Sequence, residues 1–102
     1  MSTNTQRLRV IRSRTDHDLL ILIERELDRG LALVDVAASR NSPLHTKAQK
    51  AHDTAAAMLP RIAGLHPQDR LRIEGRLHEL RSRLDRVPAY ANLRSYPASF
   101  AS

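Results

Sequence analysis

Three stretches of the chain place apolar residues every three or four positions, the spacing that gives a helix one apolar face. In residues 16–39 these positions are Leu20, Ile23, Leu27, Leu31, Val34 and Ala38. In residues 43–63 they are Leu44, Ala48, Ala51, Ala55, Met58 and Ile62. In residues 67–87 they are Ile73, Leu77, Leu80, Leu84 and Val87. The pattern predicts three amphipathic helices.

Residues that favour helix caps and turns stand at the ends of these stretches, namely Thr15, Ser42-Pro43, Gly64, His66-Pro67 and Pro88. Inside the second stretch, Pro60 lacks an N–H and clashes one turn back, so we expect a kink near Ala56. Gly30 interrupts the first stretch beside its apolar positions. A missing side chain there would let a neighbouring helix approach closely.

Short turns join the three helices, so successive helices should run antiparallel. We therefore predict an all-α fold: an antiparallel up-down-up three-helix bundle over residues 16–87. A basic N-terminal arm at 1–15 precedes the bundle, and an extended tail at 88–102 follows it. All three aromatic residues, Tyr90, Tyr96 and Phe100, lie in that tail.

Composition narrows the class of protein. The 102 residues are 41% hydrophobic but only 3% aromatic, which suits a modest core of aliphatic side chains. There is no cysteine, so disulfides and thiolate metal sites are excluded. The start lacks the apolar stretch of a secretory signal, and the longest apolar run, residues 19–23, is far shorter than the ~20 residues of a membrane span. We expect a cytoplasmic protein without a membrane span, and the excess of arginine over lysine fits a GC-rich bacterial genome.

The net charge of +6 is unevenly distributed. The arm carries Arg7, Arg9, Arg12 and Arg14 and no acidic residue. The helix at 67–87 places Arg72, Arg76 and Arg83 on one flank of its apolar face, with Arg86 further round; we call these four the arginine ridge. Several interpretations remain open. The ridge contacts phosphates or an acidic partner, or it faces the acidic helix at 16–39 or solvent. The arm follows a nucleic-acid backbone, forms a helical extension, or is a flexible end that folds onto the acidic helix.

The first helix carries more apolar residues than one face can hold. Ile21, Leu22, Leu33 and Val36 lie off its predicted core face. Contiguous exposed apolar surface generally marks an interface. The tail residues Tyr90, Leu93, Tyr96 and Phe100 are spaced to lie along a surface. We predict that these eight residues form an interface in which the tail covers the first helix, within one chain or across a symmetric dimer.

Residues with catalytic or metal-binding chemistry do not converge in the sequence. His45 and His52 share one flank of the second helix, and Glu74 and His78 are four apart on the third. The second spacing can chelate a metal, but a zinc site needs three or four ligands. Neither a Gly-x-Ser-x-Gly elbow nor a phosphate-binding glycine loop is present. We predict no catalytic, metal or cofactor site and no small-molecule substrate.

Two families share features with the helical pattern. The stretch 27–87 resembles microtubule-interacting-and-transport (MIT) domains and single tetratricopeptide-type hairpins, on the packing residues Ala48, Ala51, Ala55, Ile73, Leu77, Leu80 and Leu84. That resemblance implies a groove for a partner helix and assigns no binding residue. The stretch 20–40 resembles the first helix of the small three-helix chorismate mutases. However, Ser42-Pro43-Leu44-His45 stand where that family has a lysine and then an Arg-Glu pair.

The sequence therefore favours a non-enzymatic helical module that binds a protein partner and self-associates. The alternative is a nucleic-acid-binding accessory protein that uses the arm and the arginine ridge. Such binding would be weak and sequence-independent, because the arm has no interleaved aromatic residues for base stacking. A small helical enzyme is the third possibility.

Overall fold

The computed structural model of the chain describes residues 2–90 and, of their side chains, those of residues 14–90. The elements are α1 (Ser2–Val36), α2 (Pro43–Met58), a short 3-10 helix η1 (Leu59–Arg61) and α3 (Pro67–Arg86). No strand occurs within residues 2–90. The all-α fold with three helices, predicted from the apolar spacing, is confirmed. Over the same residues, no helix combines the length and apolar character needed to cross a membrane.

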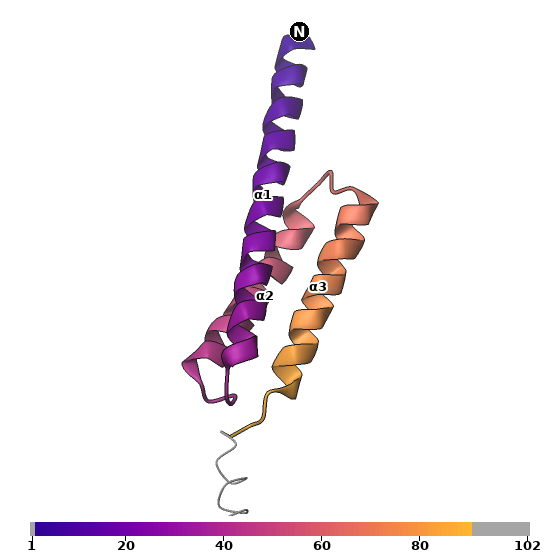
Figure 1. Cartoon of the computed structure of the whole chain (residues 1–102). Coiled ribbons are helices and arrows are strands. Elements are labelled where there is room, and N and C mark those ends of the chain that lie inside the picture. Colours follow the sequence, from indigo (N-terminus) through magenta and orange to yellow (C-terminus); the bar gives the residue numbers. More distant parts are fainter. Residues whose placement is uncertain (1, 91–102) are drawn as a thin grey trace, which may run out of the picture.

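Helix α1 is longer at its start than the apolar spacing predicted. It begins at Ser2 instead of near Asp16, so the basic arm continues the helix, and Thr15 lies inside it instead of capping it. Its 35 residues span about 52 Å, and its first turns project past the other helices (Figure 1). A projecting segment needs no apolar face, which explains why periodicity did not detect it.

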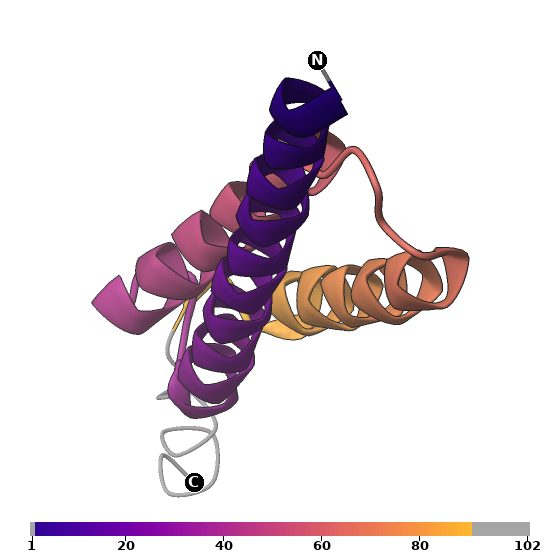
Figure 2. The same cartoon turned by 90° about the horizontal axis from the view of Figure 1, so that it is seen from above.

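Successive helices reverse direction, so α1 and α3 run the same way (Figure 1). The three ion pairs that join α1 to α3 each connect residues 48 positions apart, as expected for two parallel helices in register. Between α2 and α3 the order is inverted. His45 lies against Leu84, and Gln49 accepts a hydrogen bond from Arg81. Seen along α1, the axes of α2 and α3 diverge to opposite sides (Figure 2).

The hydrophobic core lies between the three helices. On α2 and α3 its buried members are Ala48, Ala51, Ala55, Ile73, Leu80 and Leu84, as predicted. On α1 they are Leu19, Ile23, Leu27 and Val34. The predicted positions Leu20 and Leu31 are only partly buried and Ala38 is exposed. Ile23, Leu27 and Val34 are on the predicted stripe, whereas Leu19 is buried in place of Leu20. The core face of α1 is therefore turned from the predicted stripe by less than the rotation of one residue.

All three helices meet at Gly30. A Cβ atom at this position would lie 2.6 Å from Leu80 Cδ2 of α3 and 3.3 Å from Ala51 Cβ of α2. Both distances are shorter than ordinary van der Waals contact. The close approach expected from the missing side chain is therefore present.

The starts of α2 and α3 follow the cap residues in the sequence. Ser42 Oγ accepts a hydrogen bond from the N–H of Leu44 at 3.1 Å, and Pro43 opens α2. His66 Nδ1 accepts a hydrogen bond from the N–H of Gln68 at 3.1 Å, before Pro67 opens α3. In both cases an N–H that has no acceptor within the helix is satisfied by a side chain.

The kink that we predicted near Ala56, one turn before Pro60, does not occur. The α-helix ends at Met58, and the chain continues as η1. The N–H of Leu59 still donates to the carbonyl of Ala55, but Pro60 has no N–H with which to extend the ladder. The change to 3-10 geometry removes the clash that would have bent a continuous helix.

Arg40 ties the turn after α1 to the end of α3. Its Nε donates to the carbonyl of Val87 at 2.9 Å and its Nη2 to that of Asp85 at 2.7 Å. Its backbone N–H donates to the carbonyl of Pro88 at 2.8 Å. Carbonyl groups at the end of a helix have no intrahelical donor, so Arg40 acts as a C-terminal cap from another part of the chain.

The opposite end of the bundle is joined by Asp16. Its carboxylate accepts hydrogen bonds from the backbone N–H groups of Gly64 at 3.0 Å and Ala63 at 3.4 Å. These N–H groups belong to the turn between η1 and α3. The contact marks the level at which α1 leaves the bundle.

Candidate functional site

The arginine ridge of α3 faces the carboxylates of α1. Arg72 donates to Glu24 Oε1 at 2.8 Å and to Asp69 Oδ1 at 2.8 Å. Arg76 forms an ion pair with Asp28 one turn further along. The hydrogen bond from Arg72 to Glu24, and then the one to Asp69, raise the pKa of the Arg72 guanidinium above its ordinary value.

The ridge continues at Arg83. Its Nη1 lies 2.9 Å from Asp35 Oδ1 of α1, and its Nε lies 2.6 Å from Glu79 Oε2 of α3. The hydrogen bond from Arg83 lowers the pKa of the Glu79 carboxyl below its ordinary value. Arg86 differs from the other three, because its guanidinium donates to the carbonyl and hydroxyl of Ser82 and to no carboxylate of the described residues.

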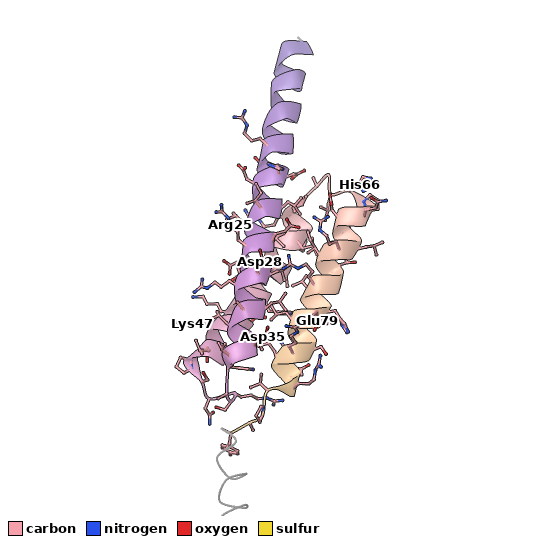
Figure 3. All side chains as sticks on the ribbon, viewed as in Figure 1. Arg25, Asp28, Asp35, Lys47, His66 and Glu79 are labelled. Atoms are coloured by element: carbon pink, nitrogen blue, oxygen red, sulfur yellow. The ribbon has the colours of Figure 1, made fainter. Side chains whose placement is uncertain are left out.

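Three of the four ridge arginines are thus paired with carboxylates inside the molecule. Figure 3 shows Asp28 and Asp35 on the side of α1 that faces α3, with Glu79 opposite them on α3. Each pair is well exposed to solvent, so it fixes the register of the helices more than it stabilises them. A phosphate would have to displace these carboxylates to bind the ridge.

The arm lies only partly within the described side chains. Arg7, Arg9 and Arg12 belong to helix α1, but their side chains lie outside the described residues. Arg14 is exposed at the level where α1 leaves the bundle.

A groove of about 370 Å³ lies between α1 and α2. It is lined by Glu26 and Arg29 of α1 and by Lys47, Lys50, Ala51 and Thr54 of α2, and we call it the cationic groove. Both lysines of the protein line it, and both are exposed. Among the side chains of residues 14–90, none of its three cations forms an ion pair. The close spacing of Lys47 and Lys50 was visible in the sequence, but Arg29 joins them only through the packing of α1 on α2.

The predicted apolar interface is divided on α1. Ile21 and Leu22 are 38% and 46% exposed near the middle of the helix, and Val36 is 64% exposed at its C-terminal end. By helix geometry, the exposed Arg25 lies on the same face between them. Leu33 differs from the prediction, because it is partly buried and packs against the core.

The tail contributes one described residue to that interface. Tyr90 is 64% exposed. Leu93, Tyr96 and Phe100 lie outside the described residues. An exposed leucine that the apolar spacing did not indicate is Leu71 on α3, which stands between two arginines and is 70% exposed.

The two histidines of α2 contact a backbone carbonyl and a neighbouring carboxylate. His45 Nε2 lies 3.3 Å from the carbonyl of Leu84, and His52 Nδ1 lies 3.1 Å from Asp53 Oδ1. The hydrogen bond from His52 lowers the pKa of Asp53 below its ordinary value. Within the part of the chain that the structure describes, no three His, Asp or Glu side chains gather where they could hold a metal ion.

Comparisons with known protein families, with curated proteins and with solved structures gave no significant match. The function of the chain has to be inferred from its own residues.

Proposed function

We propose that the chain is a non-enzymatic, helical interaction module that binds a protein partner through the outer face of α1, and that this partner is a second copy of itself. The observation that carries this proposal is the exposure of Leu22, 46%, on the side of α1 that faces away from the core. Ile21 lies beside it, and Val36 extends the same face.

The energetics support an interface at this position. Complete burial of a leucine side chain contributes about 1.5–3 kcal/mol, and nearly half of Leu22 still contacts water in the single chain. Helix α1 also offers a long, straight surface, since it continues past α2 and α3 (Figure 1). If α1 pairs with α1 of a second copy around a two-fold axis, the exposed Ile21 and Leu22 of each copy would contact the same face of α1 on the other.

Nucleic-acid binding by the arm and the arginine ridge receives less support as a function. Arg72, Arg76 and Arg83 already have carboxylate partners on α1. A cytoplasmic location in a bacterium belongs to the same proposal, and it rests on the lack of cysteine and on the arginine-rich composition.

Light scattering on the full chain tests the interface. We expect the wild-type protein to have the mass of a dimer and Leu22→Glu to have the mass of a monomer, because a buried unpaired charge opposes association. Leu71→Glu is the matched control, since it places the same charge at an exposed leucine on α3. A wild-type protein that is monomeric at high concentration, or a Leu22→Glu variant that remains a dimer, would contradict the proposal.

A further inference from the structure

The cationic groove differs in charge balance from the opposite side of α1. Toward α3, the arginines at positions 72, 76 and 83 each meet a carboxylate of α1. Toward α2, Arg29, Lys47 and Lys50 share the groove with one acidic side chain, Glu26. Ion pairing inside the molecule therefore satisfies one side of α1 and leaves an excess of positive charge on the other.

That excess includes like charges held close together. Lys47 and Lys50 are three residues apart on α2, and Arg25 and Arg29 are four apart on α1, and these are the spacings at which helical side chains are neighbours. Neighbouring like charges destabilise a helix. Figure 3 shows Arg25 and Lys47 on the same side of the molecule, away from α3. An anion bound in the groove would relieve this repulsion.

We propose that the cationic groove binds the phosphodiester backbone of a nucleic acid. Arg29, Lys47 and Lys50 provide guanidinium and ammonium groups for phosphate oxygens, and the exposed Thr54 hydroxyl provides a further donor. The site is separate from the arginine ridge. On α1 it adjoins Leu22, because Arg29 lies seven residues, or two turns, further along the same face.

The lining of the groove distinguishes this ligand from other anions. Its only apolar residue is Ala51, so no aromatic or large aliphatic side chain is present on which a nucleotide base or a protein side chain could pack. Lysine is also depleted at protein–protein interfaces. Charge alone has to supply the affinity, and a polyanion that releases condensed counterions gains most from such a site. Binding should consequently be independent of base sequence.

Fluorescence anisotropy with a labelled 20-base-pair duplex tests the site. The groove variant is Arg29→Gln, Lys47→Gln, Lys50→Gln in the full chain. The control is Arg61→Gln, Arg70→Gln, which removes positive charge at exposed residues that form no ion pair among the described side chains and belong to neither the arm nor the arginine ridge. Circular dichroism on all proteins checks that each remains folded, and the groove variant should melt at the same temperature as wild type or above it.

The salt dependence gives a quantitative expectation. Loss of three phosphate contacts should reduce the slope of log K against log salt by about 2.7 and weaken binding about tenfold or more at 50 mM salt. The control should change this slope by less than about 0.9, the value for one phosphate contact. A second duplex of unrelated sequence should bind equally well.

Three results would overturn the proposal. Equal losses in the groove variant and the control would show that only net charge matters. Undiminished binding by the groove variant, with binding abolished by replacing Arg7, Arg9 and Arg12, would assign the nucleic acid to the arm. Displacement of the duplex by micromolar pyrophosphate or ATP would show that the groove prefers a small organic phosphate.

Discussion

Gly30 of α1 leaves the space that Leu80 of α3 occupies. A Cβ atom on residue 30 would come within 2.6 Å of Leu80 Cδ2, and Leu80 is fully buried, so it has little freedom to turn aside. Ala51 stands on the other side, its Cβ at 3.3 Å from the same point. The closeness of the three helices therefore depends on one missing methyl group.

Gly30→Ala and Gly75→Ala should change stability in opposite directions. Both glycines lie inside helices, where alanine is favoured by about 1 kcal/mol. At Gly75 no atom lies within 4 Å of the added Cβ, so we expect the free energy of unfolding to rise by about 0.5–1 kcal/mol. At Gly30 overpacking should reverse the sign and cost about 1–3 kcal/mol. Urea denaturation measures both, and stabilisation by Gly30→Ala would mean that α1 lies further from α3.

Two leucines on α3, Leu80 and Leu71, should differ sharply in how much they contribute to the free energy of unfolding. Leu80→Ala removes a fully buried side chain and should cost about 2–5 kcal/mol. Leu71→Ala, on the same helix but 70% exposed, should change the free energy of unfolding by less than about 0.5 kcal/mol. Comparable midpoints of chemical denaturation for the two variants would show that the core face of α3 is misplaced.

Removal of the α1 carboxylates that pair with the arginine ridge should make the ridge a second polyanion site, in addition to the cationic groove. In Glu24→Gln, Asp28→Asn, Asp35→Asn, the arginines at 72, 76 and 83 lose their partners on α1. We expect tighter binding of duplex DNA and a steeper salt dependence, while the free energy of unfolding falls by only about 0–1 kcal/mol per pair because the pairs are exposed. Ala32→Gln, on the outer face of α1, is the control. Unchanged DNA affinity in the triple variant would show that pairing does not limit the ridge.

The stability of the chain should decrease at low pH in part because Glu79 becomes protonated. The hydrogen bond from Arg83 holds its pKa below the ordinary value of 4.5, so the native state favours the ionised carboxyl. The resulting stabilisation is fully present above that value and is lost as the pH falls through the lowered pKa. Glu79→Gln should therefore melt below wild type at pH 7 and approach it near pH 2. Glu74→Gln is the matched control, since it removes an exposed carboxyl of the same helix that forms no ion pair among the described side chains, and equal melting shifts in the two variants would contradict the role of Arg83.

The apolar spacing predicted α3 best, because only one orientation of this helix buries all its spaced apolar residues and leaves its arginines exposed. It failed at the start of α1, since residues 2–15 have no neighbouring helix to impose a pattern. Pro60 indicated a disruption of α2, but whether the helix bends or changes to 3-10 geometry depends on the packing of Leu59 and Ile62 in the core.

The charged surfaces were predictable only in part. An acidic helix between basic segments suggested internal pairing, yet the partners follow from the parallel register of α1 and α3, which no local pattern encodes. The cationic groove combines Arg29 with Lys47 from another helix, so its charge excess appears only after the helices are packed. Candidate sites built from two elements require the tertiary structure.

Arg40 should stabilise the end of α3 through its fork of donors rather than through its charge. Its Nε and Nη2 hold two different carbonyls, those of Val87 and Asp85, which a lysine ammonium cannot reach in the same planar geometry. We expect Arg40→Lys to lower the free energy of unfolding by about 1–2 kcal/mol, since hydrogen bonds from a charged donor are lost while the net charge is kept. Arg61→Lys is the control, because Arg61 is exposed and donates no side-chain hydrogen bond within residues 14–90. Amide exchange should also become faster at Val87, whose N–H bonds to Leu84 in the last turn that Arg40 caps. Equal stability of Arg40→Lys and Arg61→Lys, with unchanged exchange at Val87, would show that the turn holds α3 without this cap.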